Sequence, residues 1–415
     1  MDQIHRRFTA EQIRVLLLGY CQGTLCRSEV EEMLHLGKTR FFALLREFRR
    51  APDRFTIDYH RRTPARLSSE AEESIRAELL REKGLVEDPQ LPISDYNYSA
   101  LRDRLSQHGI TVSTTTIITR AKALGCYRPL RKSQVHDRQV LTAAIGALVQ
   151  HDASVHLWSP YAAEKWTLIT SIDDYSRKLL FADFFPHETA WAHIQAAQTL
   201  MQTYGLPLRY YVDNLRVFRF VQKRDSFWRN HVLTTDDVDP QWRQVMRTLG
   251  VDVIYALSPQ AKGKVERTFR WMQDRIVRQS ALDHLSTIDE VRAVLRYEVD
   301  RYNNHQVHAT TGQIPSLRFD QARTSGCTLF RPLALPRPYR EAKDVFCLHE
   351  TRVVNGYRRI SLFNHDIEVP NVPLREEVDV HIIPNTDTDT MEIRIWWAGK
   401  VAHSAVYPLR ALPNS

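Results

Sequence analysis

The chain has 415 residues, of which 43% are hydrophobic and 26% are charged, and its formal net charge is +8. This length predicts roughly two to four domains, and the composition is that of a globular protein. No run approaches the ~20 consecutive apolar residues of a membrane span, and the amino terminus has no apolar signal-peptide core. We therefore expect a cytoplasmic protein without a membrane partner. The basic excess favours a nucleic-acid partner without establishing one.

Cysteine usage excludes two classes of small, cross-linked domain. The number of cysteines is odd and no CxxC or CxxC…HxxxH spacing occurs, so the pattern indicates neither a disulfide framework nor a structural zinc site. Reduced thiols are the simplest interpretation. The cysteines are Cys21, Cys26, Cys126, Cys327 and Cys347.

The amino-terminal segment predicts three helices. Thr9 and Gln12 form a capping-box pattern before an apolar run, and Ser28 with Glu31 repeats the signal before a second helix. Gly37 then breaks the chain, and KTRFFALLREFRR predicts a third, basic helix. Helix, short turn and basic helix are typical of a helix-turn-helix, although a plain three-helix bundle with solvated arginines has the same pattern.

A second helix-turn-helix candidate follows a linker and a charged helix. Gly109 makes the predicted turn, Ser113 is the predicted N-cap, and residues 114–124 are the predicted recognition helix. One face of that helix carries short hydrogen-bond donors and long cations, which reach phosphates and base edges. These predicted DNA-binding residues are Thr115, Thr116, Thr119, Arg120 and Lys122.

From about residue 140 the pattern changes to short β-rich runs around one helix. Strands alternating with a helix indicate an α/β domain. After the Pro-rich RPLALPRPYR, strand-like runs separated by turns predict a small all-β barrel or sandwich at the carboxyl end. The predicted α/β elements are strands in 165–173, 177–185, 207–213 and 251–257 and a helix in 188–205.

Three acidic residues lie where phosphodiester chemistry is possible. Asp152 lies in a strand-like stretch, Asp213 ends another, and Glu266 lies in a helix that follows Ser258-Pro259. Such carboxylates can converge at one end of an α/β sheet. Two Mg²⁺ or Mn²⁺ ions held by carboxylates activate the attacking oxygen and stabilise the leaving one.

The predicted helix around Glu266 is rich in cations and amides. A carboxylate among cations can hold a metal ion while its neighbours bind phosphates of the DNA strand. A solvated helix with salt bridges between successive turns has the same composition and is common. The predicted DNA-binding residues here are Gln260, Lys262, Lys264, Arg267 and Arg270.

Five motifs in order resemble one family. SPQAKGKVERTF resembles the SPxxxGxxE helix of retroviral integrases and DDE insertion-sequence transposases, and YYVDN resembles their second-Asp strand. DASVHLW is similar to the first-Asp strand, and IDDYSRKLL to the second strand of integrase cores. RYNNHQVHATTGQIP is similar to the stretch that follows the core. Together the motifs cover about residues 148–316.

The resemblance implies a DDE transposase with an RNase H-like core. Asp152, Asp213 and Glu266 would be the catalytic residues and the ligands of two Mg²⁺ or Mn²⁺ ions. The enzyme would nick transposon ends and join the exposed 3′-hydroxyl directly to target DNA, so its partners would be transposon-end DNA and target DNA. Pairing two ends implies a homo-oligomer.

The predicted fold class is multidomain α/β, with helix-turn-helix units in front, an RNase H-like core and a small carboxyl-terminal β-barrel. The predicted domains are two helix-turn-helix DNA-binding domains at 1–65 and 66–135, the catalytic core at 140–320 and the barrel at 335–415.

Two departures from the family pattern concern the second acid. The 52 residues between Asp213 and Glu266 exceed the usual number, and the excess is an insertion at about 214–242 that carries Trp228 and Trp242. These tryptophans either stack on a distorted DNA end or dock on the core, and docking is favoured slightly. Asn214 is followed by Leu215 where the family often has Gly.

Other titratable residues compete with Asp152 for a place in the site. Asp173 and Asp174 are adjacent, so at most one faces the site, and the resemblance assigns both to the second strand. His151 and His156 flank Asp152 and either line the site or are structural. An acidic group at 236–239 is more simply a solvated loop.

Two other functions share these features. A transposase-derived DNA-binding regulator without catalysis is the alternative, and the three intact acids argue against it. A nuclease of the same fold without strand transfer is the third, and tandem helix-turn-helix units favour end recognition over it. Inverted repeats flanking the gene would support transposition.

Overall fold

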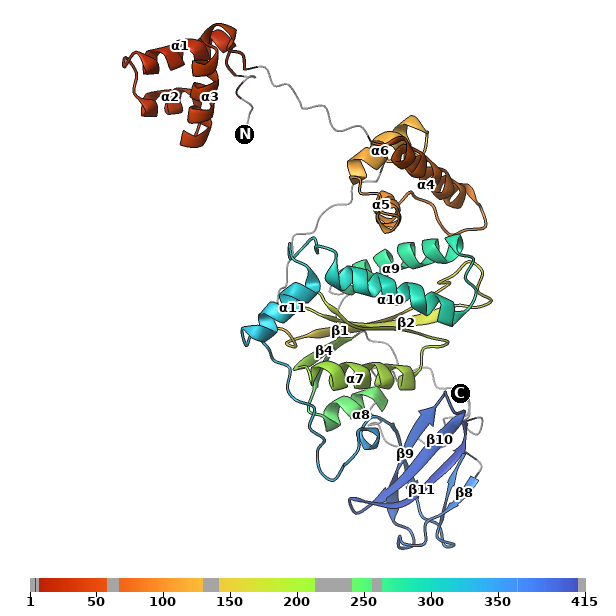
Figure 1. Cartoon of the computed structure of the whole chain (residues 1–415). Coiled ribbons are helices and arrows are strands. Elements are labelled where there is room, and N and C mark those ends of the chain that lie inside the picture. Colours follow the sequence, from red (N-terminus) through yellow and green to blue (C-terminus); the bar gives the residue numbers. More distant parts are fainter. Residues whose placement is uncertain are drawn as a thin grey trace. The chain divides into compact units, whose positions relative to one another are not determined.

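The computed structural model of the chain describes residues 4, 7–57, 67–129, 142–212, 241–255, 263–363 and 365–409. It contains two compact units, Met1–Glu73 and Ser74–Ser415, each described separately below (Figure 1). No helix in the described part of the chain is both long enough and apolar enough to cross a membrane.

The first unit is a small helical bundle. Thr9 caps its first helix, and the reciprocal bonds with Gln12 (Gln12 N to Thr9 Oγ1, 3.2 Å; Thr9 N to Gln12 Oε1, 2.8 Å) form the predicted capping box. The second helix begins earlier than the Ser28–Glu31 pattern predicted, because Glu29 accepts from the backbone N of Cys26 instead (2.7 Å). The helices are α1 (Ala10–Cys21), α2 (Arg27–Leu34), α3 (Lys38–Arg50) and the 3-10 helix η2 (Pro52–Arg54).

Three further helices precede the sheet. Gly109 takes a positive φ of 78° in the turn, and Ser113 caps the last of these helices by accepting from Thr116 N (3.1 Å), as the sequence predicted. They are α4 (Ser69–Glu87), α5 (Tyr98–Gln107) and α6 (Thr114–Ala123).

A five-stranded mixed sheet forms the centre of the second unit. Its order is β3-β2-β1-β4-β5, in which β1, β2 and β3 are antiparallel neighbours while β4 and β5 run parallel to β1. The strands are β1 (Val149–His156), β2 (Trp166–Asp173), β3 (Leu179–Phe185), β4 (Arg209–Val212) and β5 (Asp252–Tyr255). Each of the four predicted strand ranges contains one of them.

Helices cover both faces of this sheet (Figure 1). On one face, α9 and α10 bury Phe269, Met272 and Leu295 against Trp166 and Phe184 of β2 and β3. On the other face, α7 and α8 belong to a cluster around Val149 of β1. The helices of this part are α7 (Ala190–Tyr204), α8 (Gln241–Thr248), α9 (Gly263–Leu282), α10 (Ile288–Asn304) and α11 (Pro315–Thr324). A mixed α/β core is thereby confirmed.

The prediction of a closed barrel at the carboxyl end is wrong. Within the described residues, β11, β10, β9 and β6 form an open four-stranded sheet in that order, and β7 pairs only with β8 in a separate hairpin. Their apolar side chains form one cluster on one face of the four-stranded sheet. The elements are η4 (Ala342–Asp344), β6 (Leu348–Val353), β7 (Arg359–Leu362), β8 (His365–Glu368), β9 (Glu377–Asn385), β10 (Thr390–Trp397) and β11 (Lys400–Pro408).

Candidate active site

Strand β1 presents two chemically different faces. Successive side chains of a strand point to opposite sides, so Val149 and His151 share one face while Gln150, Asp152 and Ser154 share the other. The backbone of β1 is bonded on both sides, to β2 and to β4, which fixes these directions. The two faces contact different helices, as described next for His151 and Asp152.

The His151 face is a closed structural network. His151 is fully buried, with its Nδ1 2.8 Å from Ser171 Oγ and its Nε2 2.8 Å from His193 Nδ1 on α7. His193 Nε2 in turn lies 3.2 Å from a carboxylate oxygen of Glu188. Trp242 stacks on His151 at 5.7 Å and 11°, so this tryptophan of the predicted insertion docks in the core, whereas Trp228 lies outside the described residues. His151 therefore supports the sheet from the side opposite Asp152.

The Asp152 face meets helix α9. Asp152 is 8% exposed and pairs in register with buried Thr170 of β2. Two residues further along the same face, Ser154 Oγ accepts a hydrogen bond from Gln273 Nε2 of α9 (3.2 Å). The carboxylate of Asp152 thus lies on the sheet face that carries the helix of Glu266. His156 lies on the same face of β1 as Asp152 but four residues further along the strand. Burial, with a smaller effect of the Lys165 charge, lowers the pKa of His156.

The other two predicted acids are only partly described. Asp213 follows Val212, the last residue of β4, and lies outside the described residues. Glu266 lies in the first turns of α9, whose side chains are described only from Thr268 onward. Of the basic residues predicted around it, Arg270 is exposed on α9. Gln260 and Lys262, and the side chains of Lys264 and Arg267, lie outside the described part.

The rival acids Asp173 and Asp174 are engaged in the turn between β2 and β3. Asp173 accepts from Gly146 N (2.9 Å), Ser176 N (2.7 Å) and Ser176 Oγ (2.6 Å). Asp174 accepts from Gln150 Nε2 (2.6 Å) and pairs with Arg177 (2.8 Å). Both are fully buried, and burial is the main cause that raises the pKa of Asp173. These bonds give the two acids a structural role at the end of β2.

In the predicted recognition helix α6, one predicted DNA-binding side chain is hydrogen-bonded to the helix backbone. Thr115 and Thr119 are exposed, and the Thr119 hydroxyl donates to the Thr115 carbonyl (2.9 Å). Thr116 and Arg120 are half-buried, while the exposed Lys122 ammonium lies 4.7 Å from the centre of the Tyr127 ring. The exposed face therefore offers Thr115, Thr119 and Lys122 to solvent.

Sequence similarity connects this chain to transposases. No family model matches it. The protein y4bF of Sinorhizobium fredii (strain NBRC 101917 / NGR234), which is named as a transposase, is 29% identical over 265 residues, covering 63% of this chain and 53% of that protein. The transposase for insertion sequence IS1202 of Streptococcus pneumoniae is 28% identical over 170 residues, covering 41% of this chain and 35% of that protein. The predicted resemblance to insertion-sequence transposases is confirmed. The chain spans about half or less of the length of these relatives.

Solved integrase structures are more distant. The catalytic core domain of BIV integrase is 19% identical, covers 44% of this chain and 98% of its own, and has a TM-score of 0.31. The HTLV-2 integrase catalytic core, solved in complex with magnesium, is 17% identical, covers 44% of this chain and 99% of its own, and has the same TM-score.

Two contacts on either side of β1 could not be predicted from the sequence. The Ser154–Gln273 hydrogen bond joins residues 119 positions apart, and both side chains are common on solvated surfaces. The buried His151–His193 pair likewise joins β1 to α7 across 42 positions. A signal would have required pairing information between elements, which the pattern of a single chain lacks.

Proposed function

We propose that this chain is a DDE transposase that nicks transposon ends and joins the 3′-hydroxyl to target DNA. Asp152, Asp213 and Glu266 are its catalytic carboxylates and the ligands of two Mg²⁺ or Mn²⁺ ions. The observation that carries the proposal is the Ser154–Gln273 hydrogen bond, because it attaches the helix of Glu266 to the strand face of Asp152. The similarity to named transposases supports the reaction class.

The strand register supports pairing Asp152 with Asp213. Strands β1 and β4 are parallel, with Val149 beside Tyr210 and Gln150 beside Tyr211. Asp213 directly follows Val212, the last residue of β4, and our proposal places it beside Asp152 by continuing this offset. Paired positions of neighbouring strands share a sheet face and lie about 5 Å apart, within reach of a shared pair of metal ions.

Helix periodicity supports adding Glu266 to the pair. Position 266 precedes Gln273 by seven residues, close to two helical turns, so both belong to one face of α9. Ser159 Oγ donates to the Leu285 carbonyl (2.5 Å) just beyond α9, so the helix runs along β1 in the same sense. Asp152 precedes Ser154 on β1, and Glu266 precedes Gln273 on α9. Because the strand and the helix run in the same sense, both acids lie on the same side of the Ser154–Gln273 contact.

These carboxylates suit hard divalent cations, because oxygen ligands bind Mg²⁺ and Mn²⁺ and few protein ligands suffice when water and phosphate complete the shell. When bound, two such ions supply activation of the attacking oxygen and stabilisation of the leaving oxygen. Asp152 is paired with Thr170 of β2, and β1 is also paired with β4 just before it, which holds the backbone of this ligand position in place. The basic residues around Glu266, with Arg270 exposed on α9, bind phosphates of the DNA strand.

The test is catalysis by single conservative variants of the full chain. Asp152→Asn, Asp213→Asn and Glu266→Gln each remove a negative charge while keeping side-chain shape. We expect each to reduce Mg²⁺-dependent nicking and joining of terminal DNA by about a hundredfold or more, the order of loss when one charge-stabilising group is removed from an active site. Binding to terminal DNA in a filter assay should persist.

The matched control is Asp289→Asn, because Asp289 is an exposed carboxylate on α10 whose side chain is 81% exposed. It should leave nicking and joining unchanged. Wild-type activity in the Asp152, Asp213 and Glu266 variants would refute the assignment. A wild-type chain that binds terminal DNA but never cuts it would instead be the non-catalytic regulator.

We further propose that the four-part division predicted from the sequence separates end binding from catalysis, and that a homo-oligomer pairs two ends. In this arrangement α6 reads transposon-end DNA through Thr115, Thr116, Thr119, Arg120 and Lys122. Its Ser113-capped start and exposed Thr115, Thr119 and Lys122 support this role. Helix amino ends and such side chains contact phosphates and base edges in other DNA-binding helices.

Salt dependence tests this role of α6. Lys122→Ala should weaken binding to terminal DNA and reduce the slope of log affinity against log salt by about one, as expected when one phosphate contact is lost. Lys83→Ala on α4, where Lys83 pairs with Glu87 (3.7 Å), is the control and should leave the slope unchanged. Equal effects of the two substitutions would mean that α6 is not the reading helix.

A further inference from the structure

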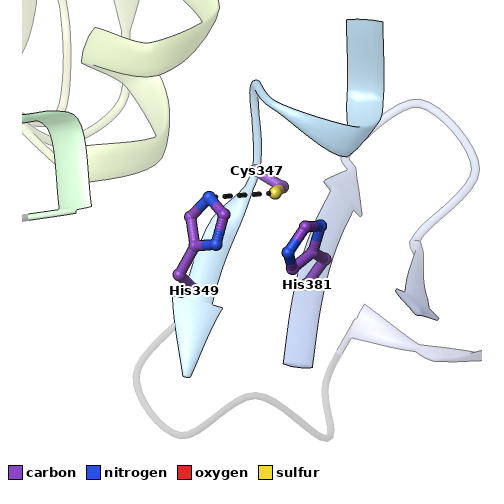
Figure 2. Close-up of side chains that lie close together, drawn as sticks. All are labelled: Cys347, His349 and His381. Carbon is purple, nitrogen blue, oxygen red and sulfur yellow. Dashed lines mark hydrogen bonds between the residues drawn. The ribbon is translucent and has the colours of Figure 1, made fainter. Parts of the chain in front are cut away.

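A cysteine and two histidines meet beside the carboxyl-terminal sheet, although the cysteine spacing alone indicated no zinc site. Cys347 directly precedes β6, His349 lies on β6, and His381 lies on β9 (Figure 2). His349 and His381 are directly paired in the β6–β9 register, which places both imidazoles on one sheet face. The residues come together only through this strand pairing.

The ligand atoms have spacing suited to one ion. One Nδ1, Nε2 or Sγ atom from each side chain lies within 4.8 Å of the others. Cys347 Sγ lies 3.4 Å from His349 Nε2, close to the about 3.6 Å that separates sulfur and nitrogen ligands in a tetrahedral zinc site. The two imidazole centres are 4.4 Å apart (Figure 2). Donors of a tetrahedral zinc site lie roughly 3.3–3.8 Å apart, so the most distant pair would have to approach by up to about 1.5 Å to bind a single ion.

Cys347 and His381 are buried, His349 is half-buried, and one ring nitrogen of the cluster lacks a hydrogen bond within the described residues. Cys347 is fully buried and His381 is 1% exposed, and His381 Nδ1 has no hydrogen-bond partner among the described residues. A buried polar atom without a partner costs about 1–3 kcal/mol.

The surrounding charges accept a cation. Arg394 of β10 is paired in register with His381 and bonds Asp344 (2.5 Å), Glu341 (3.1 Å) and Glu392 (2.6 Å). Lys343 also contacts Glu341 and Glu392. The positive charge of Arg394 next to His381 is therefore matched by carboxylates.

We propose that Cys347, His349 and His381 form a binding site for one Zn²⁺ ion, with water in the fourth position. Sulfur and imidazole donors favour zinc over the Mg²⁺ of the carboxylate site. Binding displaces one proton: the Cys347 thiol releases H⁺, its sulfur bonds the ion, and both histidines bind as neutral imidazoles. The ion ties the segment after η4 to β6 and β9, which is a structural role independent of transposition.

The alternative is a reactive or purely packing cysteine. Cys347 is fully buried, so its thiol is shielded from reagents in solution and a reactive role is not supported. A packing role accounts for the thiol, which donates to the Asp344 and Val345 carbonyls (3.6 and 3.9 Å). It does not account for two imidazoles close to the sulfur, or for His381 Nδ1, which has no hydrogen-bond partner among the described residues.

Cobalt substitution in the metal-free full chain tests the proposal. Co²⁺ added after dialysis against a chelator should bind with one equivalent per chain at this site and produce a sulfur-to-cobalt charge-transfer band. Zn²⁺ should abolish the band by displacement, whereas Mg²⁺ should not. Co²⁺ bound by the carboxylates of the proposed active site gives no sulfur band, so failure of either proposal is distinguishable from failure of the other.

Variants assign the ligands. Cys347→Ser should abolish the band, while Cys126→Ser, the matched change of another buried cysteine, should retain it. His349→Gln should weaken Zn²⁺ binding by at least about a hundredfold, beyond the 10–100-fold cost of losing an outer partner. Absence of the band in wild-type protein, where misfolding of a variant plays no part, overturns the proposal. So does a band that persists in folded Cys347→Ser, checked by circular dichroism.

Discussion

Arg278 of α9 forms a buried ion pair with α4. Its side chain is 2% exposed, and its guanidinium bonds Glu82 of α4 (2.6 Å), Asp274 (2.7 Å) and the Asp95 carbonyl (2.8 Å). Glu82 is fully buried and also pairs with Arg104 (2.8 Å). Such networks are stable only while every charge keeps its partner.

Replacing Arg278 by Met should lower the free energy of unfolding of the second unit by about 3–5 kcal/mol, the cost of breaking a buried ion pair from one side. Urea denaturation followed by circular dichroism measures this change. Arg270→Met, at an exposed position of the same helix, should change the free energy by no more than about 0.5 kcal/mol. Similar values for the two variants would show that the buried network contributes little.

Asp173 gives stability a pH dependence of predictable sign. Its pKa is raised above 3.8 in the folded chain, mainly by burial. Between 3.8 and the raised value the folded state binds more protons than the unfolded state, so this residue's contribution to stability falls as pH rises through that window.

Asp173→Asn removes this titration. The unfolding free energy of wild type minus that of the variant should therefore be largest near pH 4 and should decrease as pH rises, on top of a constant offset from altered hydrogen bonds. Urea titrations at several pH values measure the difference, with Asp289→Asn as an exposed control that stays parallel to wild type. A difference that grows with pH would contradict the assigned direction.

At the scale of elements, what the sequence predicted well was local. Alternation and apolar runs predicted β2 to β5, and the break at Gly37 predicted the limits of α3. The start of α2 was misplaced because Ser28–Glu31 and Cys26–Glu29 are competing capping patterns two residues apart. The barrel was overpredicted because alternation defines strands but not whether the last strand returns to the first.

In the candidate site too, the local features could be predicted from the sequence and the long-range contacts could not. Asp152 was predicted from a strand motif, but the facts that orient it depend on partners far away in the sequence: the α9 contact of Ser154 and the register of β1 with β4. The Cys347–His349–His381 cluster was missed for this reason, since its third residue arrives only by the β6–β9 pairing.

The contact between β1 and α9 predicts a positioning effect. Gln273→Ala should cost about 0.5–1.5 kcal/mol of stability, the usual net value of one hydrogen bond, but should slow nicking by up to about a hundredfold, because a shift of about 1 Å in a catalytic group has that effect. Single-turnover nicking at saturating Mg²⁺ measures it. Gln279→Ala removes a hydrogen bond to Asp283, which directly follows α9 (2.7 Å), and should leave the rate unchanged.

At the scale of the whole molecule, ion pairs attach the helices α4 and α5 to helices that cover the sheet. Asp103 of α5 pairs with Arg275 of α9 (2.9 Å) and Arg301 of α10 (2.7 Å), and Arg278 pairs with Glu82 of α4. The sequence predicted these helices one by one because helical periodicity and turn signals report on each helix by itself. Long-range ion pairs between charged faces that each look solvated are not visible in such patterns.

The unit Met1–Glu73, in contrast, has its own apolar core and should unfold independently. Phe41 is fully buried there and packs edge-on against Tyr20 with ring centres 5.0 Å apart. A domain of this size is only marginally stable, so Phe41→Ala, which costs about 3–5 kcal/mol, should unfold the unit within an otherwise folded chain. Calorimetry of the full chain should show two transitions, of which Phe41→Ala removes the smaller. Leu295→Ala in the core of the second unit should lower only the larger transition. A single transition shifted by both substitutions would mean that the two units fold as one.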